Sequence, residues 1–347
     1  MEYVNDINIM EAVIHILDNN SDEPILNEYK VELTDDVYKF IYKHVDRCLK
    51  SEELKYAIFN PERHVVKDVT QDYLNGVTSD LVLVSQELAR QLFYIMRANS
   101  EISSCDLLTV SISTDQGPMI GILKMDYIKN FTHKVDFVDD KIGIGIVEQA
   151  AGLPASAQKV QKCAFIKPFR EDQDINLMVI DKKKKSSEED EYGANYFTNN
   201  YLGCTLIQNE RDMTKTFVKA TETWTRNNII EDADKAEEIR TTIKNKLKDE
   251  EVINIEELSR ELFKEEESRM KDDFTTFVRG HGLGDDVEVD KLWVEKKMKR
   301  TRLNIDKEID LYIDDETYHD NSKFEIVRNG DGSINLVIKN VKNYIEK

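Results

Sequence analysis

The stretch that decides the fold runs from Cys105 to Tyr127 and reads CDLLTVSIS-TDQGP-MIGILKMDY. Its first and last parts are apolar runs that contain several β-branched residues, which favour strands. The middle part, Thr114–Pro118, combines Asp, Gly and Pro, the residues that typically form turns. Two strand-like runs on either side of a turn predict a β-hairpin.

Other strand-like runs lie on both sides of this hairpin in the sequence. Each is short and apolar, and turn-forming or polar residues separate one run from the next. We therefore expect a mostly antiparallel sheet in the N-terminal part of the chain. The runs are INIMEAVIHIL (7–17), KVDFVD (134–139), IGIGIVEQ (142–149), QKCAFIKP (161–168) and INLMVID (175–181).

Two helices are predicted before the hairpin, and we expect them to pack on the sheet. Thr34 can cap the first helix, because its hydroxyl can accept a hydrogen bond from an early backbone amide. Apolar residues then recur at helical spacing from Val37 to Leu49, and the second helix extends from about Ser79 to Ala98. The segment KKKKSSEEDE (182–191) instead predicts a solvated loop, in which the lysines are neutralised by the acids that follow.

After Asn195 the pattern becomes mainly helical, and it returns to strands near the C-terminus. Asn-Gly and Asp-Gly steps at 329–332 supply positive φ angles and predict a terminal hairpin. The fold class is therefore α+β: an N-terminal, mostly antiparallel sheet with packed helices, and a C-terminal helical region followed by a terminal β-hairpin. We expect an α+β domain at 1–207 and a helical, then β domain at 208–347. The later helices are expected at 214–227, 232–248, 254–264 and 268–281, and the strands at 309–314, 324–329 and 334–339.

The chain has 347 residues, enough for about two domains, and a formal net charge of −20. This acidity argues against extensive coating of DNA, because affinity for DNA comes mainly from Lys and Arg that neutralise phosphates. It leaves room for a local basic surface. No apolar run approaches the ~20 residues that a membrane-spanning helix needs, and the N-terminus lacks the features of a secretory signal. We expect a cytoplasmic protein without a membrane partner.

The cysteines and histidines form no pattern typical of metal ligands. The cysteines, Cys48, Cys105, Cys163 and Cys204, include no CxxC pair, so we expect buried, reduced thiols. No two of the six histidines are three or four residues apart, and His44 on an apolar helix face is expected to be packed. The sequence therefore predicts no metal and no cofactor.

The enzyme motifs that can be recognised by spacing are absent from the sequence, including GxxxxGK[ST], GxSxG and HExxH. A metal-dependent nuclease is the one alternative with any support, because acids on a hairpin with a nearby lysine can bind a divalent cation. Its candidates are weak, since Ile122 is where a second carboxylate is expected. We predict no enzymatic activity. The acids and lysines considered were Asp106, Asp115, Lys124 and Asp126, and in a second group Asp174, Asp181 and Lys183.

The segment KLWVEKKMKRTR (291–302) is the most basic part of the sequence, with six cations and one acid, Glu295. It is interpreted either as a phosphate-contacting surface or as a solvated helix face that balances nearby acids. The two short helices expected before it, at 254–264 and 268–281, weakly resemble a winged-helix module. The candidate DNA-binding residues of this segment are Lys291, Lys296, Lys297, Lys299, Arg300 and Arg302.

Seven strings, in order along nearly the whole chain, resemble the bacterial nucleoid-associated protein family of the NdpA/YejK type, in its Gram-positive branch. The resemblance implies a nucleoid-localised DNA-binding protein without catalytic residues. The polar residues of these strings are the ones that packing alone explains least. We therefore add Lys124, Lys162, Lys167 and Arg226 to the candidate DNA-binding residues. The strings are VIHILDNNSDEPIL (13–26), ARQLFYIMR (89–97), ISSCDL (102–107), GILKMDY (121–127), QKCAFIKPF (161–169), ATETWTRNN (220–228) and FEIVRNGDGSINLVIKN (324–340).

Two hypotheses from different classes follow. The first is a non-enzymatic nucleoid protein, expected to be a homodimer, that contacts the backbone of double-stranded DNA through local basic patches with low sequence specificity. The second is an acidic adaptor that binds a DNA-processing protein and touches DNA little or not at all.

Overall fold

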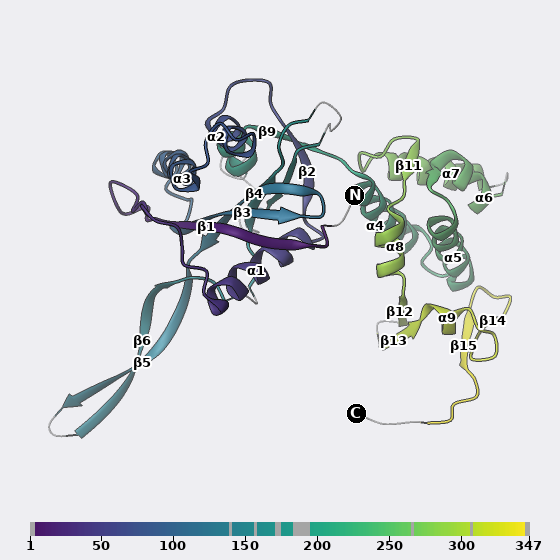
Figure 1. Ribbon diagram of the computed structural model, residues 1–347. Helices are drawn as coiled ribbons and strands as arrows, with labels where there is room; N and C mark the ends of the chain where they lie inside the picture. The colour runs from purple at the N-terminus through teal and green to yellow at the C-terminus, as the bar shows by residue number, and fades with distance from the viewer. Residues whose placement is uncertain are drawn as a thin grey trace. The chain divides into compact units, whose positions relative to one another are not determined.

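In the computed structural model, the predicted hairpin of Cys105–Tyr127 is part of a seven-stranded sheet (Figure 1). The strand order is β1-β3-β4-β7-β8-β2-β9, and each neighbouring pair is antiparallel. The structure describes residues 4–138, 141–155, 158–170, 175–182, 195–264, 267–305 and 308–343. The strands are β1 (Ile7–Leu17), β2 (Lys55–Phe59), β3 (Cys105–Thr114), β4 (Gly117–Asp126), β7 (Lys162–Ile166), β8 (Leu177–Asp181) and β9 (Cys204–Ile207).

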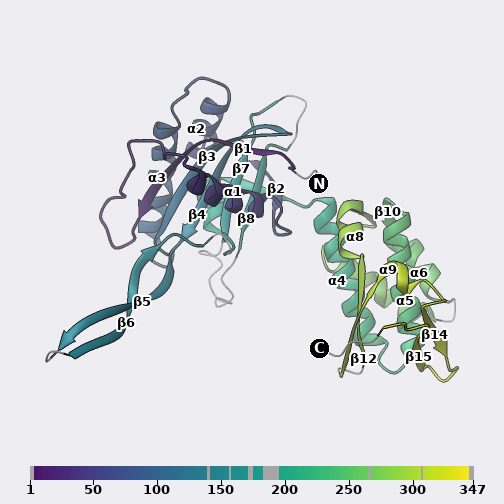
Figure 2. The ribbon, with the colours of Figure 1, turned by 60° about the horizontal axis from the view of Figure 1, so that its bottom comes forward.

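Helices cover both faces of this sheet. Seven consecutive residues of β4, Met119–Met125, are buried, and successive strand residues point to opposite faces. The helices α2 (Val65–Leu74) and α3 (Leu81–Ala98) lie on one face, and α1 (Asp35–Leu49) lies on the other (Figure 2). The Thr34 hydroxyl caps α1 by accepting from the amide of Val37, which confirms the predicted start of that helix.

The runs at 134–139 and 142–149 form strands, but they do not join the sheet. They lie in β5 (Ile128–Val138) and β6 (Lys141–Gly152), which pair with each other and extend away from the sheet as a separate hairpin (Figure 1). The expectation that these two runs belong to the N-terminal sheet is therefore wrong. A π-helical turn (Phe197–Leu202) leads from the region after β8 into β9.

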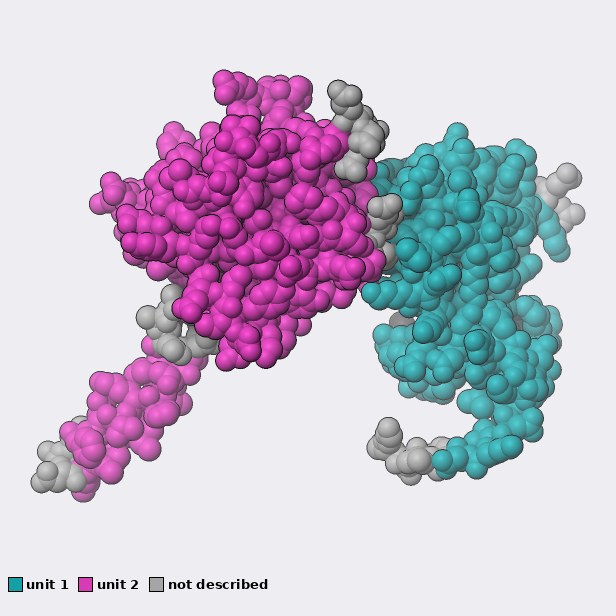
Figure 3. Space-filling model, in the orientation of Figure 1, with its two compact units in different colours: residues 1, 208–347 teal, residues 2–207 magenta. Residues whose placement is uncertain are grey.

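Residues 208–347 form a second compact unit, distinct from the unit of residues 2–207 (Figure 3). The terminal hairpin is confirmed as β14–β15, with positive φ at Gly330 and Gly332. The elements of this unit are α4 (Glu210–Asn228), α5 (Ala233–Asp249), β10 (Val252–Asn254), α6 (Ile255–Leu262), α7 (Ser268–Arg279), β11 (Asp286–Glu288), α8 (Lys291–Lys297), β12 (Arg300–Ile305), β13 (Ile309–Asp314), α9 (Asp315–Tyr318), β14 (Phe324–Arg328) and β15 (Ile334–Ile338).

The second unit has a core of its own around Trp224 of α4, whose ring meets Phe263 and Phe274 edge-on. The indole Nε1 donates to Asp273 Oδ2 at 2.7 Å, so the buried ring keeps a polar partner. The resemblance to a winged helix is not supported. The strand before α6 (β10) pairs with the strand after α7 (β11), and the helix α8, rather than a hairpin, comes next in the chain. The observed secondary structure confirms the α+β fold class.

All four cysteines are buried and unpaired, as expected. Burial raises the pKa of the Cys105 and Cys204 thiols to about 12, so both remain protonated at neutral pH. His44 is packed, and its Nε2 donates to the carbonyl of Pro154 at 3.2 Å. Within the described part of the chain, no helix has both the length and the apolar composition required to cross a membrane.

Candidate nucleic-acid interface

The basic segment 291–302 changes from helix to strand within its length. Asp290 caps its start, because the Oδ1 atom accepts from the amide of Trp293 at 2.9 Å. The helix α8 ends at Lys297, and β12 begins at Arg300. The six cations therefore do not share one helix face, so the interpretation of the whole segment as a solvated helix face is wrong.

A buried ion pair holds α8 against α4. Arg211 Nε lies 3.1 Å from Asp290 Oδ2, and both side chains are almost fully buried. The backbone amide of Asp290 also donates to Thr214 Oγ1 at 2.9 Å. Trp293 and Val294 of α8 belong to the buried core of the unit. These contacts fix the direction in which the lysines of α8 extend.

Lys291 has a structural role at the end of another helix. Its Nζ donates to the carbonyl oxygens of Leu247 and Lys248, at 3.2 and 2.8 Å. These carbonyls belong to the last turn of α5, where an α-helix leaves acceptors unsatisfied and its dipole favours a cation. Lys291 therefore attaches α8 to α5.

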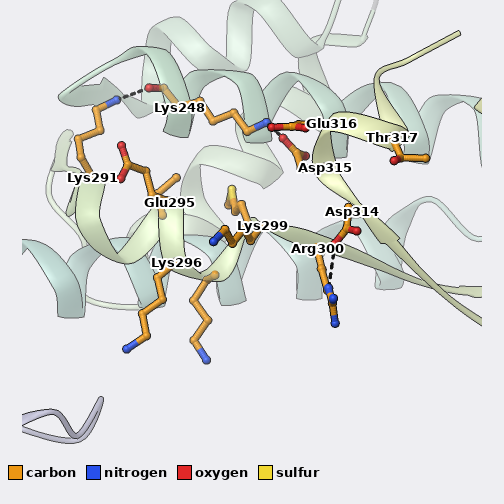
Figure 4. A pocket seen from close by; sticks show the side chains of 13 residues that line it. Lys248, Lys291, Glu295, Lys296, Lys299, Arg300, Asp314, Asp315, Glu316 and Thr317 are labelled. Atoms are coloured by element: carbon orange, nitrogen blue, oxygen red, sulfur yellow. Dashed lines mark hydrogen bonds and ion pairs between the residues drawn. The ribbon is translucent and has the colours of Figure 1, made fainter.

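An open hollow of about 950 Å³ lies between α5, α8, β12 and α9. Figure 4 shows Lys248 reaching toward Asp315 on its upper side, while Lys296 extends away from these acids. Six cations and four acids are among its lining residues. These charged residues are Lys248, Lys291, Lys296, Lys297, Lys299 and Arg300, with Glu295, Asp314, Asp315 and Glu316.

Acids inside the unit neutralise several of these cations. Arg300 Nε lies 2.8 Å from Asp314 Oδ1 across the β12–β13 pair, and Lys248 forms an ion pair with Asp315. Burial alone would raise the pKa of the Asp315 carboxyl, but hydrogen bonds and positive charge from Lys244 and Lys248 hold that pKa below its ordinary value. Asp315 is therefore ionised at neutral pH and forms ion pairs with both Lys244 and Lys248.

Arg302 lies outside the hollow on β12, where it pairs with Asp310 at 3.1 Å.

Three lysines remain on the exposed side of the hollow: Lys296, Lys297 and Lys299, which we call the cationic edge. All three side chains are exposed. Lys296 and Lys299 form no ion pair with any residue that the structure describes. Lysine ammonium groups act as point charges toward phosphate, without a fixed geometry of recognition. The edge can therefore contact a phosphate backbone but is too small to cover a long one.

Of two candidates in the first unit, Lys124 is buried and Lys162 is partly buried. Lys124 is only 2% exposed; its Nζ donates to the carbonyl of Ser103 at 3.1 Å and pairs with Asp126. Lys162 pairs with the buried carboxylate of Asp181. Burial removes Lys124 from the surface, and the ammonium group of Lys162 is occupied by Asp181. The inference that packing does not explain these two lysines is therefore corrected.

The remaining candidates are placed apart from the cationic edge. Lys167 follows β7 and donates to Gln116 Oε1 at 2.6 Å. Arg226 is exposed on α4 and pairs with Glu222 at 2.6 Å. Of the lysines at 182–185, Lys182 pairs with Glu53 at 3.1 Å, and the others lie outside the described residues.

The acids of the nuclease alternative each have a protein partner. Asp106 accepts from the Tyr127 hydroxyl at 2.8 Å, Asp126 pairs with Lys124, and Asp115 accepts from the amide of Asn5 at 3.2 Å. Across the ranges that the structure describes, no group of His, Cys, Asp and Glu side chains could hold a metal ion. Asp174 and Lys183 lie outside those ranges.

Sequence reasoning missed Lys248 and Asp315, which line the hollow with the basic segment. Lys248 is in the last turn of α5 and Asp315 opens α9, each far from the segment in sequence. The only signal available was the position of Lys248 near a predicted helix C-terminus, which does not indicate what lies next to it.

The fold and this surface define a two-unit α+β protein with a small exposed cluster of lysines beside ion-paired residues. The model of the family described as nucleoid-associated protein YejK matches residues 13–346, nearly the whole chain, and the chain belongs to this family. No curated protein matches the sequence.

Proposed function

We propose that this chain is a non-enzymatic, nucleoid-associated protein of the cytoplasm that binds double-stranded DNA through the cationic edge. Membership of the nucleoid-associated family supports the location and the type of partner. The observation that carries the proposal is the position of Lys296 and Lys299, which are exposed on a helix end fixed to the core and have no ion-pair partner among the described residues.

The geometry favours contact with the backbone rather than with bases. Lysines on a short helix and the following turn can neutralise phosphates, which position a protein on DNA but carry no sequence information directly. Neutralising two or three phosphates gives a slope of log affinity against log salt of about −2 to −3 for duplex DNA. We therefore expect weak binding with low sequence specificity.

The test removes two positive charges from the cationic edge and compares the loss of DNA affinity with that caused by removing two lysine charges from another surface. Lys296→Gln with Lys299→Gln should reduce the salt slope by about 2, since each lysine that contacts a phosphate contributes about one. The matched control is Lys39→Gln with Lys43→Gln, which removes two exposed lysines from α1. Fluorescence anisotropy on two unrelated duplexes measures both the slope and the specificity.

The control should bind like the wild type, and the edge variant should lose affinity for both duplexes by a similar factor. Equal losses in the edge variant and the control would contradict a local interface, as would strong preference for one duplex.

The adaptor hypothesis is the second candidate, and a specific observation favours it. Arg300 and Arg302 already pair with acids of the same unit, and Lys291 donates to carbonyls of α5, so only part of the basic segment is left for DNA. An anionic surface can instead dock on a protein that binds DNA. If affinity for duplex DNA is no better than millimolar at low salt, and a DNA-processing protein is recovered with this chain after nuclease treatment, the adaptor function replaces the proposed one.

A further inference from the structure

The hairpin of β5 and β6, which we call the arm, has two chemically different faces. Residues that pair directly across an antiparallel ladder project to the same side. Val135 pairs with Ile144, and Phe137 pairs with Ile142. The alternate positions carry polar residues and glycines, including Lys134 and Asp136, which form an ion pair at 3.0 Å. The mainly apolar face carries Phe131, Val135, Phe137, Ile142, Ile144 and Ile146, with His133 and Glu148 as its polar positions.

This apolar face is open to solvent. The six side chains are between 47% and 81% exposed, and β5 and β6 pair only with each other. A two-stranded hairpin is marginally stable by itself in water and needs a packed apolar face to persist. Because no other element of the described chain supplies that packing, the arm requires an external cover.

We infer that the cover is the arm of a second copy of this chain, packed face to face across a two-fold axis. The six side chains present about 700 Å² per copy, close to the ~800 Å² that each partner buries in an interface of standard size. A two-fold interface requires one patch to complement itself. A face whose apolar residues extend from base to tip meets that requirement, since Phe and Ile from the base of one arm pack on those from the tip of the other.

The charge distribution also favours a second copy at this place. The chain has a net charge of −20, so two copies repel each other over most of their surface. The arm, from Ile128 to Gln149, has three lysines and four acidic residues and is nearly neutral. It is therefore a region where two strongly acidic copies can approach at little electrostatic cost.

The experiment places a charge on one face of the arm or on the other. Ile144→Asp with Ile146→Asp would bury two carboxylates in the interface, and we expect the full-length chain to dissociate at least ~100-fold more readily. Val147→Asp is the matched control, because Val147 is the neighbour of Ile146 and pairs with Thr132 on the opposite face. Sedimentation velocity measures the dimer, and circular dichroism verifies that each variant is folded.

A second variant keeps the test valid if the aspartates unfold the arm. Ile144→Cys places a thiol near the expected two-fold axis, and the four native cysteines are buried and do not compete. Mild oxidation should give a dimer linked through residue 144 at high yield. Thr132→Cys, on the opposite face, should not form this link.

Three results would overturn the proposal. The first is a wild-type chain that is monomeric at micromolar concentration. The second is an Ile144→Asp, Ile146→Asp variant that dimerises as tightly as Val147→Asp. The third is a monomeric wild-type chain that co-sediments with neutral phosphatidylcholine vesicles and a variant with the same two aspartates that does not. That result would assign the face to lipid. The arm does not contain the cationic edge, so loss of DNA binding in the edge variants leaves this inference intact.

Discussion

His15 of β1 illustrates how one buried side chain makes stability depend on pH. Its Nδ1 accepts from the backbone amide of Asn27 at 3.0 Å, and its Nε2 is 2.8 Å from Ser85 Oγ. This geometry fits the neutral ring with a proton on Nε2. Burial, with a smaller contribution from the positive charge of Arg90, lowers the pKa of His15 to about 4.

We predict that the first unit loses stability as the pH falls. The His15 ring has a pKa near 6.5 in the unfolded chain and about 4 in the folded chain. Between these two pH values only the unfolded chain binds the proton, so the stabilisation that is present above pH 6.5 is lost as the pH falls from 6.5 to 4. The free energy of unfolding should drop by about 2 kcal/mol between pH 8 and pH 5 on account of His15. Urea denaturation of the wild type, His15→Gln and the exposed control His133→Gln measures the effect.

His15→Gln should remove this part of the slope, whereas His133→Gln should keep it. A residual slope is expected from His44, whose pKa burial also lowers. Equal slopes in all three proteins would show that His15 does not titrate as the hydrogen bonds require.

At the scale of elements, the ion pair of Arg211 and Asp290 determines where α8 lies. We predict that Asp290→Ala lowers the free energy of unfolding of the second unit by about 3–5 kcal/mol, because it removes the carboxylate that pairs with the buried Arg211 charge. Loss of the helix cap adds about 1 kcal/mol. The variant should also bind DNA more weakly, since the cationic edge is part of the same helix end.

The double variant Arg211→Met, Asp290→Ala provides the control, because an apolar side chain then replaces the buried cation. Its stability should exceed that of Asp290→Ala alone by at least ~1 kcal/mol. Additive losses would mean that the two residues act independently. Urea denaturation followed by tryptophan fluorescence suits this unit, since both Trp224 and Trp293 belong to it.

At the scale of the whole molecule, the two units have separate cores. The buried cluster around α2 and α3 contains residues of the first unit only, and the cluster around Trp224 contains residues of the second only. We predict two transitions in calorimetry of the full chain. Asp290→Ala should lower the temperature of one, and acidification to pH 5 should act through His15 on the other.

A single transition that both changes shift as a whole would contradict independent units. The domain boundary near residue 208 would then require revision.

The sequence by itself determined the features that depend on neighbours along the chain. The hairpin of Cys105–Tyr127, the Thr34 cap and the glycine turn at 329–332 follow from local hydrogen bonding, side-chain period and backbone freedom. The family resemblance belongs with these, because it was carried by strings of adjacent residues that the family match now confirms.

Only the tertiary structure decided which charged residues are available. Lys124, Lys162 and Lys296 are all lysines that the sequence offers as candidates, yet the first two pair with carboxylates of the same unit while Lys296 is exposed. Their burial depends on strands and helices that are distant in sequence and packed on both faces of one sheet. Whether a cation is solvated or paired is a property of that packing, and the pattern of residues along the chain does not contain it.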